Sequence, residues 1–221
     1  MMKTQKDIIL ERYKKASQQD EEFLKNRWGS YESMIGRFKA VIDAVDFTNR
    51  DSWLDAGCGT GRLFIEADNI EKFELVIGID FSYDQIKMAH ERNVHKNVRF
   101  VLSDLEHIPF KEKFSLVTCI GTIYCCGIEL KKIISSLSTA AAVGGLLVIN
   151  SVNPFWHRFK ESQNLNIEAN IYPTVETIEK EILGLDLKIV DRFGMNPLED
   201  SLYPEVSSET KEYLIVAEKG R

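Results

Sequence analysis

SWLDAGCGTGRL, residues 52–63, places three glycines at alternate positions directly behind a short apolar run. Glycine weakens an ordinary strand or helix, because it loses more conformational freedom on folding than any other residue. The same freedom lets the backbone adopt positive φ angles and approach a ligand closely. A short strand that ends in such a turn is typical of an open parallel sheet that binds a ligand beyond its strand ends.

Short apolar runs alternate with helical patterns from about residue 50 onward. Five runs indicate strands because they are short and rich in β-branched residues, namely 53–56, 74–80, 98–102, 114–120 and 145–150. Ser82 and Gln85 have the spacing of a capping box that begins a helix. A later helix is expected at 174–185, and two last strands at 187–193 and 212–218, separated by a polar loop at 196–209. The alternation predicts an α/β fold with a doubly wound, mostly parallel sheet and helices on both faces.

About 50 residues precede the first strand, and their pattern is mostly helical. One helical stripe can pack on the sheet, and it consists of Met34, Phe38, Val41, Ile42 and Val45. The segment 6–28 supplies an outer helix, which is either a lid or a cover for apolar surface. We therefore expect an N-terminal helical extension or lid, residues 1–50, and a ligand-binding domain, residues 51–221, in one globular unit.

The composition excludes several classes of protein. Acidic residues outnumber basic ones by 34 to 28 and no basic run occurs, which disfavours a nucleic-acid partner. The four cysteines, Cys58, Cys119, Cys125 and Cys126, lack the spacing of a metal site and are expected to be free thiols, so no metal is predicted. Since no apolar stretch approaches a membrane span and the start is charged, we expect a cytoplasmic monomer or homodimer without membrane association.

Polar markers follow three successive predicted strands. The first is the turn at Gly57, Gly59 and Gly61, and the second is Asp80, about 20 residues later, where a carboxylate can accept hydrogen bonds from a ribose diol. The third is Asp104, suited to accept from an exocyclic amino group. Because the carboxyl ends of parallel strands meet at one edge of the sheet, these groups predict a nucleotide-like ligand in one crevice.

Phosphate is not the obvious target of this crevice. A dinucleotide fingerprint G-x-G-x-x-G needs glycine or alanine at position 62, which is Arg62, and the glycines here run G-x-G-x-G. A P-loop would need Gly-Lys-Ser/Thr, which is absent from the sequence. A nicotinamide dehydrogenase is the alternative class of nucleotide-binding protein, and Arg62 disfavours it.

The ordered motifs resemble the class I S-adenosylmethionine-dependent methyltransferases. LDAGCGTG (54–61) is similar to the first family motif, IGIDFS (77–82) to the second, SDLEHIPF (103–110) to the adenine-contacting segment and FSLVTCIGTIY (114–124) to the fourth. The resemblance covers about residues 30–150 and departs at Ser115, where the family commonly has an aspartate. It implies a seven-stranded sheet whose last strand is antiparallel. It also implies S-adenosyl-L-methionine across the strand ends, with S-adenosyl-L-homocysteine as the product.

The resemblance assigns the adenosine half of the cofactor to four residues. Asp80 would hold the ribose hydroxyls and Phe81 would lie against the adenine. Asp104 and Leu105 would meet the adenine edge.

The methionine half is assigned to the turn and to the fourth motif. Gly57 and Gly59 would lie beside it, Asp55 would organise the turn, and the backbone near Cys119 and Ile120 would face the amine.

The segment WGSYESMIGRF (28–38) is similar to a pattern that precedes the first motif in some family members. Arg37 can pair bidentately with the methionine carboxylate, or it is an exposed helix arginine. Tyr13, Trp28 and Tyr31 either close over the cofactor or pack in an ordinary way.

The acceptor is expected beyond the fourth and fifth strands. An alcohol acceptor usually needs a general base, whereas a neutral amine does not, and the candidate catalytic residues there are Tyr124 and His157. Asn153, Phe155 and Trp156 would add a pocket wall or pack on the sheet. The short, acidic chain favours a small-molecule acceptor, a sugar or metabolite, methylated at N or O. A transfer RNA or protein methyltransferase and a non-catalytic binding protein are the alternatives.

Overall fold

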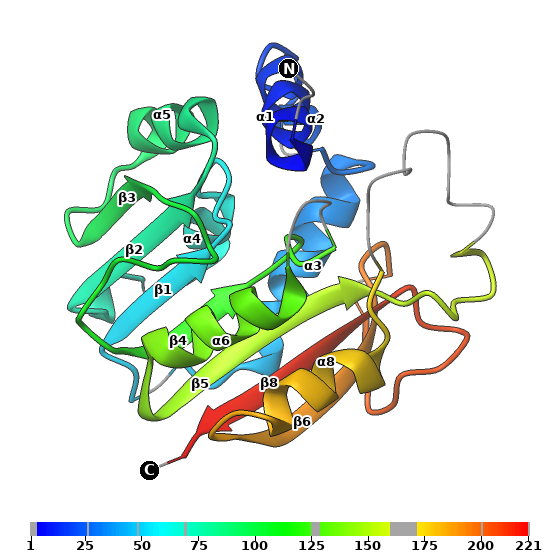
Figure 1. Cartoon of the computed structure of the whole chain (residues 1–221). Coiled ribbons are helices and arrows are strands. Elements are labelled where there is room, and N and C mark those ends of the chain that lie inside the picture. The colour runs from blue at the N-terminus through cyan, green and yellow to red at the C-terminus, as the bar shows by residue number, and fades with distance from the viewer. Residues whose placement is uncertain are drawn as a thin grey trace.

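The computed structural model describes residues 4–25, 27–47, 49–68, 70–124, 129–159, 172–199 and 201–220. In this part of the chain, helices cover both faces of one central sheet (Figure 1). The predicted α/β class and doubly wound layering are therefore confirmed. Among the helices of the described residues, none combines the length and the apolar character needed to cross a membrane.

The sheet of the described residues has eight strands in the order β3-β2-β1-β4-β5-β8-β6-β7. Their bounds are Ser52–Ala56 (β1), Leu75–Asp80 (β2), Val98–Leu102 (β3), Phe114–Cys119 (β4), Ala141–Val152 (β5), Leu187–Asn196 (β6), Ser201–Tyr203 (β7) and Glu212–Lys219 (β8). Strands β1 to β5 run parallel, whereas β8 is antiparallel to both neighbours, β5 and β6. The last strand of the chain is thus antiparallel, as the resemblance implied.

All seven expected strands are present, and β7 is an addition at the edge of the sheet. It lies in the segment expected to be a polar loop and pairs antiparallel with the end of β6, from Gly194 to Asn196. Leu202 of β7 packs against the hydrophobic core. Three residues are too few to show the alternation of a strand, so this pairing emerges only once β6 is in place.

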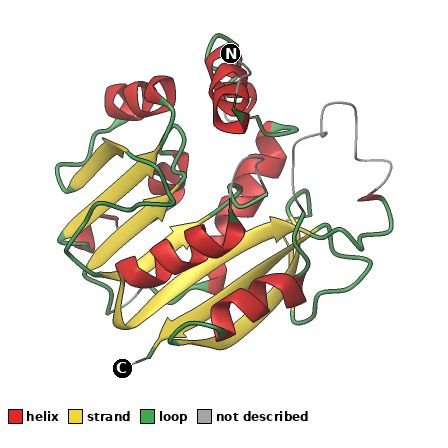
Figure 2. Ribbon diagram, in the orientation of Figure 1, coloured by secondary structure: helices red, strands yellow, loops and turns green. Residues whose placement is uncertain are grey.

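The helices divide between the two faces of the sheet. Helices α3 (Tyr31–Ala44), α4 (Arg62–Glu66) and α5 (Tyr83–Arg92) pack on one face. Helices α6 (Leu130–Ala140) and α8 (Val175–Leu183) pack on the other face, which is turned to the viewer in Figure 2. A short 3₁₀ helix, Ile70–Lys72, precedes β2. Because both faces are covered, the parallel strands are apolar on both sides.

Trp53 of β1 is at the centre of the core on the α3 face. Its side chain is fully buried. Phe64, Phe47 and Phe73 surround it, with ring centroids 4.9, 5.3 and 5.5 Å away. Aromatic side chains bury the largest apolar area of any residues, so this cluster fixes the start of β1 and the turn that follows the strand.

The N-terminal extension contains two further helices, α1 (Gln5–Ala16) and α2 (Glu22–Lys25), in place of the single outer helix that was expected. Both are at the top of Figure 1, and Phe23 of α2 packs against the core on the α3 face. The stripe expected on the inner helix is confirmed, because all five side chains belong to the core or pack against it: Met34, Phe38, Val41, Ile42 and Val45.

Helix α5 begins at Ser82 as predicted, but the predicted capping box is absent. The Ser82 side chain makes no capping hydrogen bond, and Gln85 donates instead to the Lys25 carbonyl of α2 at 2.8 Å. The Asp80 carboxylate accepts from the N–H of Ser82 at 2.9 Å. A hydrogen bond between α5 and α2 therefore takes the place of the predicted local capping box.

Ser115, the departure from the family pattern, joins the starts of β1 and β4. Its hydroxyl donates to Asp51 at 2.8 Å and accepts from the N–H of Ser52 at 3.0 Å. These bonds lie at the amino ends of the strands, away from the cofactor edge.

Candidate active site

The turn after β1 folds against the end of β2. The N–H of Gly57 donates to the Ile79 carbonyl at 2.8 Å. Gly57, Gly59 and Gly61 have φ angles of 84°, 53° and 73°, which L side chains rarely adopt. A Cβ at Gly57 would lie 2.3 Å from Oγ1 of Thr122. The glycines therefore have the positive φ angles that the sequence predicted, and Gly57 packs too closely on Thr122 for a side chain.

Asp80, the last residue of β2, closes the turn through its side chain. Oδ2 accepts from the N–H of Gly59 at 3.0 Å and Oδ1 from the N–H of Ser82 at 2.9 Å. Burial raises the pKa of Asp80 to about 6, although backbone N–H groups act in the opposite direction. Each carboxylate oxygen has two lone pairs, so Asp80 can accept further hydrogen bonds from a ligand.

Asp55 is bound to the neighbouring strand β4. Its Oδ1 accepts a hydrogen bond from the Thr118 hydroxyl at 2.7 Å, and that hydroxyl accepts from the indole N–H of Trp53 at 2.9 Å. Burial raises the pKa of Asp55 to about 7, with a smaller contribution from the charge of Asp80 and an opposing one from Thr118. The side chain thus links β1 to β4, in addition to its position next to the glycine turn.

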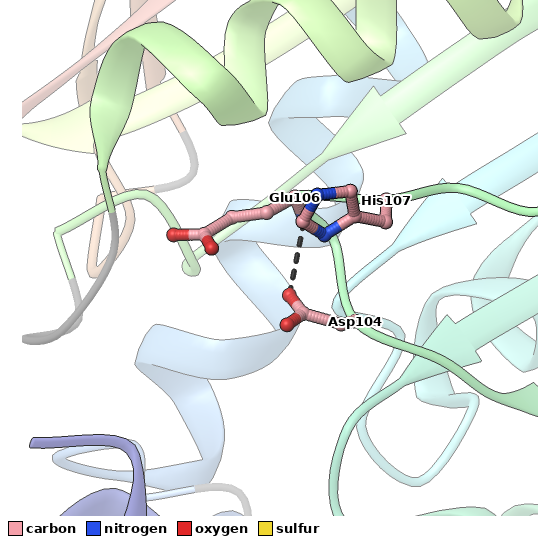
Figure 3. Close-up of side chains that lie close together, drawn as sticks. All are labelled: Asp104, Glu106 and His107. Atoms are coloured by element: carbon pink, nitrogen blue, oxygen red, sulfur yellow. Dashed lines mark hydrogen bonds between the residues drawn. The ribbon is translucent and has the colours of Figure 1, made fainter. Parts of the chain in front are cut away.

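The loop after β3 brings three polar side chains together, Asp104, Glu106 and His107 (Figure 3). Their potential ligand atoms lie within 4.8 Å of one another, an arrangement that could hold a metal ion. The Nζ of Lys6 lies 2.7 Å from Asp104 and 2.8 Å from Glu106. The hydrogen bond from Lys6 lowers the pKa of Glu106 below its ordinary value. The ammonium group of α1 therefore supplies the positive charge that these carboxylates attract.

A cavity of about 920 Å³, including space open to solvent, lies at the carboxyl ends of β1, β2 and β4. Eight of the ten residues expected to bind the cofactor line it: Asp55, Gly57, Gly59, Asp80, Phe81, Asp104, Leu105 and Ile120. The structure thus brings the separate motifs to one place.

Cys119 does not line this cavity. It ends β4 with its side chain fully buried in the core on the α6 face. Ile120, the next residue, reaches the cavity. Cys58 and Cys119 form no disulfide in the described part of the chain, and Cys125 and Cys126 lie outside the described residues.

Arg37 is bound to Glu212 and is not among the described residues that line the cavity. Its Nε donates to one carboxylate oxygen at 2.6 Å and its Nη2 donates to the other. Nη1 donates to the Ser33 carbonyl at 3.1 Å. Arg37 is 4% exposed and Glu212 is fully buried. The expected pairing with a methionine carboxylate is corrected, since the bidentate face of the guanidinium is occupied; an exposed helix arginine is equally excluded.

This ion pair supports the cavity wall. Glu212 also accepts from Nδ2 of Asn150 at 2.8 Å, and Oδ1 of Asn150 accepts from the N–H of Gly121 at 2.6 Å. Gly121 lines the cavity with a φ of 71°. The Arg37 guanidinium lies 4.0 Å from the ring centroid of Trp28, which also lines the cavity.

Neither candidate catalytic residue is among the described residues that line the cavity. Tyr124 lies two positions after Thr122, which does line it, and stacks on Tyr172 with a centroid distance of 6.0 Å. The Nδ1 of His157 lies 2.9 Å from the carbonyl oxygen of Ser208, and the side chain is 49% exposed. His157 is therefore held by the loop before β8.

Helix α1 contributes cavity residues that sequence reasoning missed, Lys6 and Ile9. Tyr13 and Trp28, for which two interpretations were open, also line the cavity, whereas Tyr31 does not. Lys6, Ile9 and Tyr13 share one helical face because they are spaced by three and four residues. That spacing was available in the sequence, but the unbroken apolar run 8–10 obscured it.

The fold and the site together define a class of protein. A glycine-rich turn after β1, a carboxylate at the end of β2 and a polar loop after β3 surround one cavity, on a sheet whose last strand is antiparallel. These features are those of the class I S-adenosylmethionine-dependent methyltransferases. The methyltransferase domain family matches residues 48–214, and the chain belongs to that family.

Relatives and solved structures agree with this assignment. The chain is 26% identical over 126 residues to the malonyl-[acyl-carrier protein] O-methyltransferase of Bacillus anthracis, a match that covers 53% of this chain and 46% of that protein. The chain thus spans about half the length of the curated relatives it matches. Among solved structures, the N-methyltransferase NodS of Bradyrhizobium japonicum, in complex with S-adenosyl-L-homocysteine, has a TM-score of 0.64 at 15% identity, covering 96% of this chain and 98% of that one. The CcbJ methyltransferase of Streptomyces caelestis has a TM-score of 0.67 at 16% identity, covering 96% of each chain.

Proposed function

We propose that this chain transfers a methyl group from S-adenosyl-L-methionine to a nitrogen or oxygen atom of a small-molecule acceptor. The observation that carries the proposal is one cavity that collects residues of all four family motifs. The membership of the methyltransferase domain family supports the same reaction. The acidic composition supports a metabolite acceptor over a nucleic acid, and the curated relatives are named for methyl transfer to the oxygen of a malonyl group on acyl-carrier protein.

The adenosine half of the cofactor would lie between β2 and the loop after β3. Asp80 has acceptor capacity for a ribose diol beyond its bonds to the turn. Phe81 and Leu105 supply apolar surface for a purine ring, and Asp104 supplies an acceptor for its amino group. These contacts fit a nucleoside without a phosphate, because the described cations that line the cavity, Lys6 and Arg62, are both paired with carboxylates.

The methionine half would lie over the glycine turn. Gly57 and Gly59 present backbone instead of side chains to the cavity, and Ile120 also lines it, so the backbone near Ile120 would face the amine. Since Arg37 is held by Glu212, the methionine carboxylate must be bound by other donors.

Helix α1 would act as the cover of the site. Lys6, Ile9 and Tyr13 face the cavity from one side of the helix, and the Tyr13 ring lies edge-on to Phe81 at 6.0 Å. Covering the site excludes water, and methyl transfer from a sulfonium is efficient only when water is excluded. We therefore assign residues 1–50 the role of a lid and residues 51–221 that of the methyltransferase domain.

The protein's main contribution to the reaction would be alignment. Bound S-adenosyl-L-methionine supplies an electrophilic methyl group, so the chain must hold an acceptor atom in line with it. Tyr124 remains the candidate for contact with the acceptor because it lies two positions after Thr122, which lines the cavity. His157 is engaged with Ser208 and would need to turn away from it to act as a base.

An acceptor screen tests the proposal. The purified chain is incubated with S-adenosyl-L-methionine and with separate pools of amines, alcohols and carboxylic acids, and release of S-adenosyl-L-homocysteine is measured. We expect release with at least one pool and none with an Asp80→Ala variant. Binding of the cofactor without release from any pool would favour a non-catalytic binding protein.

A further inference from the structure

Lys211 presents a half-buried ammonium group at the sheet edge where the acceptor is expected. Its N–H donates to Oδ1 of Asn196 at 2.8 Å, and its carbonyl accepts from the N–H of Asn153 at 2.9 Å. These two bonds fix Lys211 beside the end of β5, immediately before β8. In the part of the chain that the structure describes, its ammonium forms no ion pair.

Lys211 differs in this respect from the cations around the cofactor cavity. Those cations are paired with carboxylates: Lys6 with Asp104 and Glu106, Arg37 with Glu212, and Arg62 with Glu22 and Glu66. Burial lowers the pKa of Lys211 below its ordinary value, while the neighbouring Glu212 acts against that shift. A half-buried cation with no carboxylate partner is stabilised when an anion binds to it.

Trp156 brings a second cation to the same place. The Nζ of Lys211 and the Cζ of Arg158 each lie 5.8 Å from the ring centroid of Trp156. The neighbouring Phe155 is 68% exposed. Two cations thus lie beside one aromatic ring in a chain whose net charge is -6: Arg158 comes from the same short segment as the ring, and Lys211 from the residue before β8.

This group is connected to the cofactor cavity by a short path through the protein. Lys211 is adjacent in sequence to Glu212, whose carboxylate binds Asn150, and Asn150 binds the N–H of the cavity residue Gly121. Both sites therefore lie at the carboxyl edge of the parallel strands, where ligands of such sheets bind. An acceptor anchored at Trp156 would extend toward the cofactor along this edge.

We propose that Lys211, Arg158 and Trp156 bind a carboxylate or phosphate group of the methyl acceptor, so that the acceptor is an anion. The inference rests on the proposed function, because it names the substrate class of that reaction. Ammonium and guanidinium groups donate charge-assisted hydrogen bonds to anionic oxygens. The indole ring and Phe155 offer apolar surface to the organic part of the same molecule.

Titration with two simple anions tests this inference. The full chain, saturated with S-adenosyl-L-homocysteine, is titrated with succinate and, separately, with inorganic phosphate. The indole N–H signal of Trp156, assigned with a Trp156→Phe variant, is followed by NMR. We expect a saturable shift with at least one anion, and the anion that shifts the signal identifies the group as carboxylate or phosphate.

Matched variants separate this site from general attraction to positive charge. Lys211→Met should lower the affinity for the anion by roughly tenfold or more, since a charge-assisted hydrogen bond is lost. Arg158→Gln should also lower this affinity. Lys188→Met should leave the affinity for the anion unchanged, because Lys188 lies opposite Glu218 in the β6–β8 register, at the other end of β8.

No saturable shift with either anion, or equal affinity in Lys211→Met, would overturn the inference. Calorimetric binding of S-adenosyl-L-homocysteine by the same sample distinguishes the two claims. If that binding is retained while the anion response is absent, only the anionic acceptor is refuted; if the cofactor itself fails to bind, the proposed function is refuted.

Discussion

The ammonium group of Lys6 lies 2.7 Å from the carboxylate of Asp104, a residue 98 positions later in the chain. Lys6 also lies 2.8 Å from Glu106. The two ion pairs hold α1 to the loop after β3, the same loop that the family resemblance assigns to the adenine. The cover of the cavity is thus fastened to the part of the site that would recognise the base.

Lys6→Met should remove the two ion pairs that hold α1 to the loop after β3. Partly exposed ion pairs contribute up to about 1 kcal/mol each, so we expect S-adenosyl-L-homocysteine to dissociate roughly fivefold faster. Stopped-flow displacement measures the rate. Lys14→Met, an exposed position in the last turn of the same helix, is the matched control. Equal dissociation rates in the two variants would show that Lys6 does not hold the cover.

The buried pair of Arg37 and Glu212 should dominate the stability of the N-terminal extension. Glu212→Ala leaves a buried guanidinium without its partner, which typically costs about 3 to 5 kcal/mol. Removing both charges with Arg37→Met and Glu212→Ala together should cost less than Glu212→Ala alone. Urea unfolding measures these differences, with Glu129→Ala at the exposed pair with Lys132 as the control. A Glu212→Ala variant as stable as Glu129→Ala would contradict the role of the pair.

Gly121→Ala should damage both stability and cofactor binding. The position has a φ of 71°, and its Cβ would lie 2.0 Å from the Trp28 ring. Gly144→Ala is a matched control, because Gly144 has a φ of 74° but nothing within 4 Å of an added Cβ. Gly144→Ala should cost about 1 to 2 kcal/mol from backbone strain alone.

Trp28→Ala provides the second arm of this comparison. It removes the ring that an alanine at position 121 would meet, so the double variant should recover part of the stability that Gly121→Ala loses. Denaturation midpoints and calorimetric titration with S-adenosyl-L-homocysteine report the two effects. Identical costs for Gly121→Ala and Gly144→Ala would mean that the Trp28 contact does not shape the wall.

The buried Asp55 should make stability depend on pH. Its pKa is about 7 in the folded chain and about 3.9 in an unfolded chain. The folded state therefore binds the proton more tightly, and stability falls as the pH rises from about 4 to about 7. We expect the free energy of unfolding to be lower at pH 8 than at pH 5 by an amount on the order of 2 kcal/mol from this group.

Asp55→Asn isolates that contribution. An asparagine oxygen can still accept from Thr118, but it does not titrate. Asp80 has a raised pKa as well and leaves part of the pH dependence in the variant. Urea unfolding at pH 5 and pH 8 should show a smaller change in the variant than in the unaltered chain. The same change in both would exclude Asp55 as a source.

Local patterns predicted the parts of the fold and site that depend on neighbours in sequence. The strands β1 to β5, the glycine turn and Asp80 were found because apolar runs, glycine spacing and strand ends are visible over a few residues. Eight expected cofactor residues then met in one cavity, since parallel strands present their carboxyl ends at one edge.

Contacts between distant segments could not be predicted in this way. Arg37 pairs with Glu212, 175 positions away, and a glutamate at the start of a strand resembles a solvent-facing residue. Lys6 likewise looks like a solvated helix lysine until the loop after β3 is placed beside it. Gln85 likewise donates to the Lys25 carbonyl instead of completing a capping box, because α2 lies within hydrogen-bonding distance of its side chain.

Calorimetric titration of the purified chain with S-adenosyl-L-homocysteine tests the central claim most directly, with NADH titrated in parallel. The residues around Asp80 and the glycine turn predict one site with micromolar affinity for S-adenosyl-L-homocysteine and no heat of binding for NADH. Binding of NADH alone, or of neither compound to the folded chain, would contradict the assignment of this cavity to S-adenosyl-L-methionine.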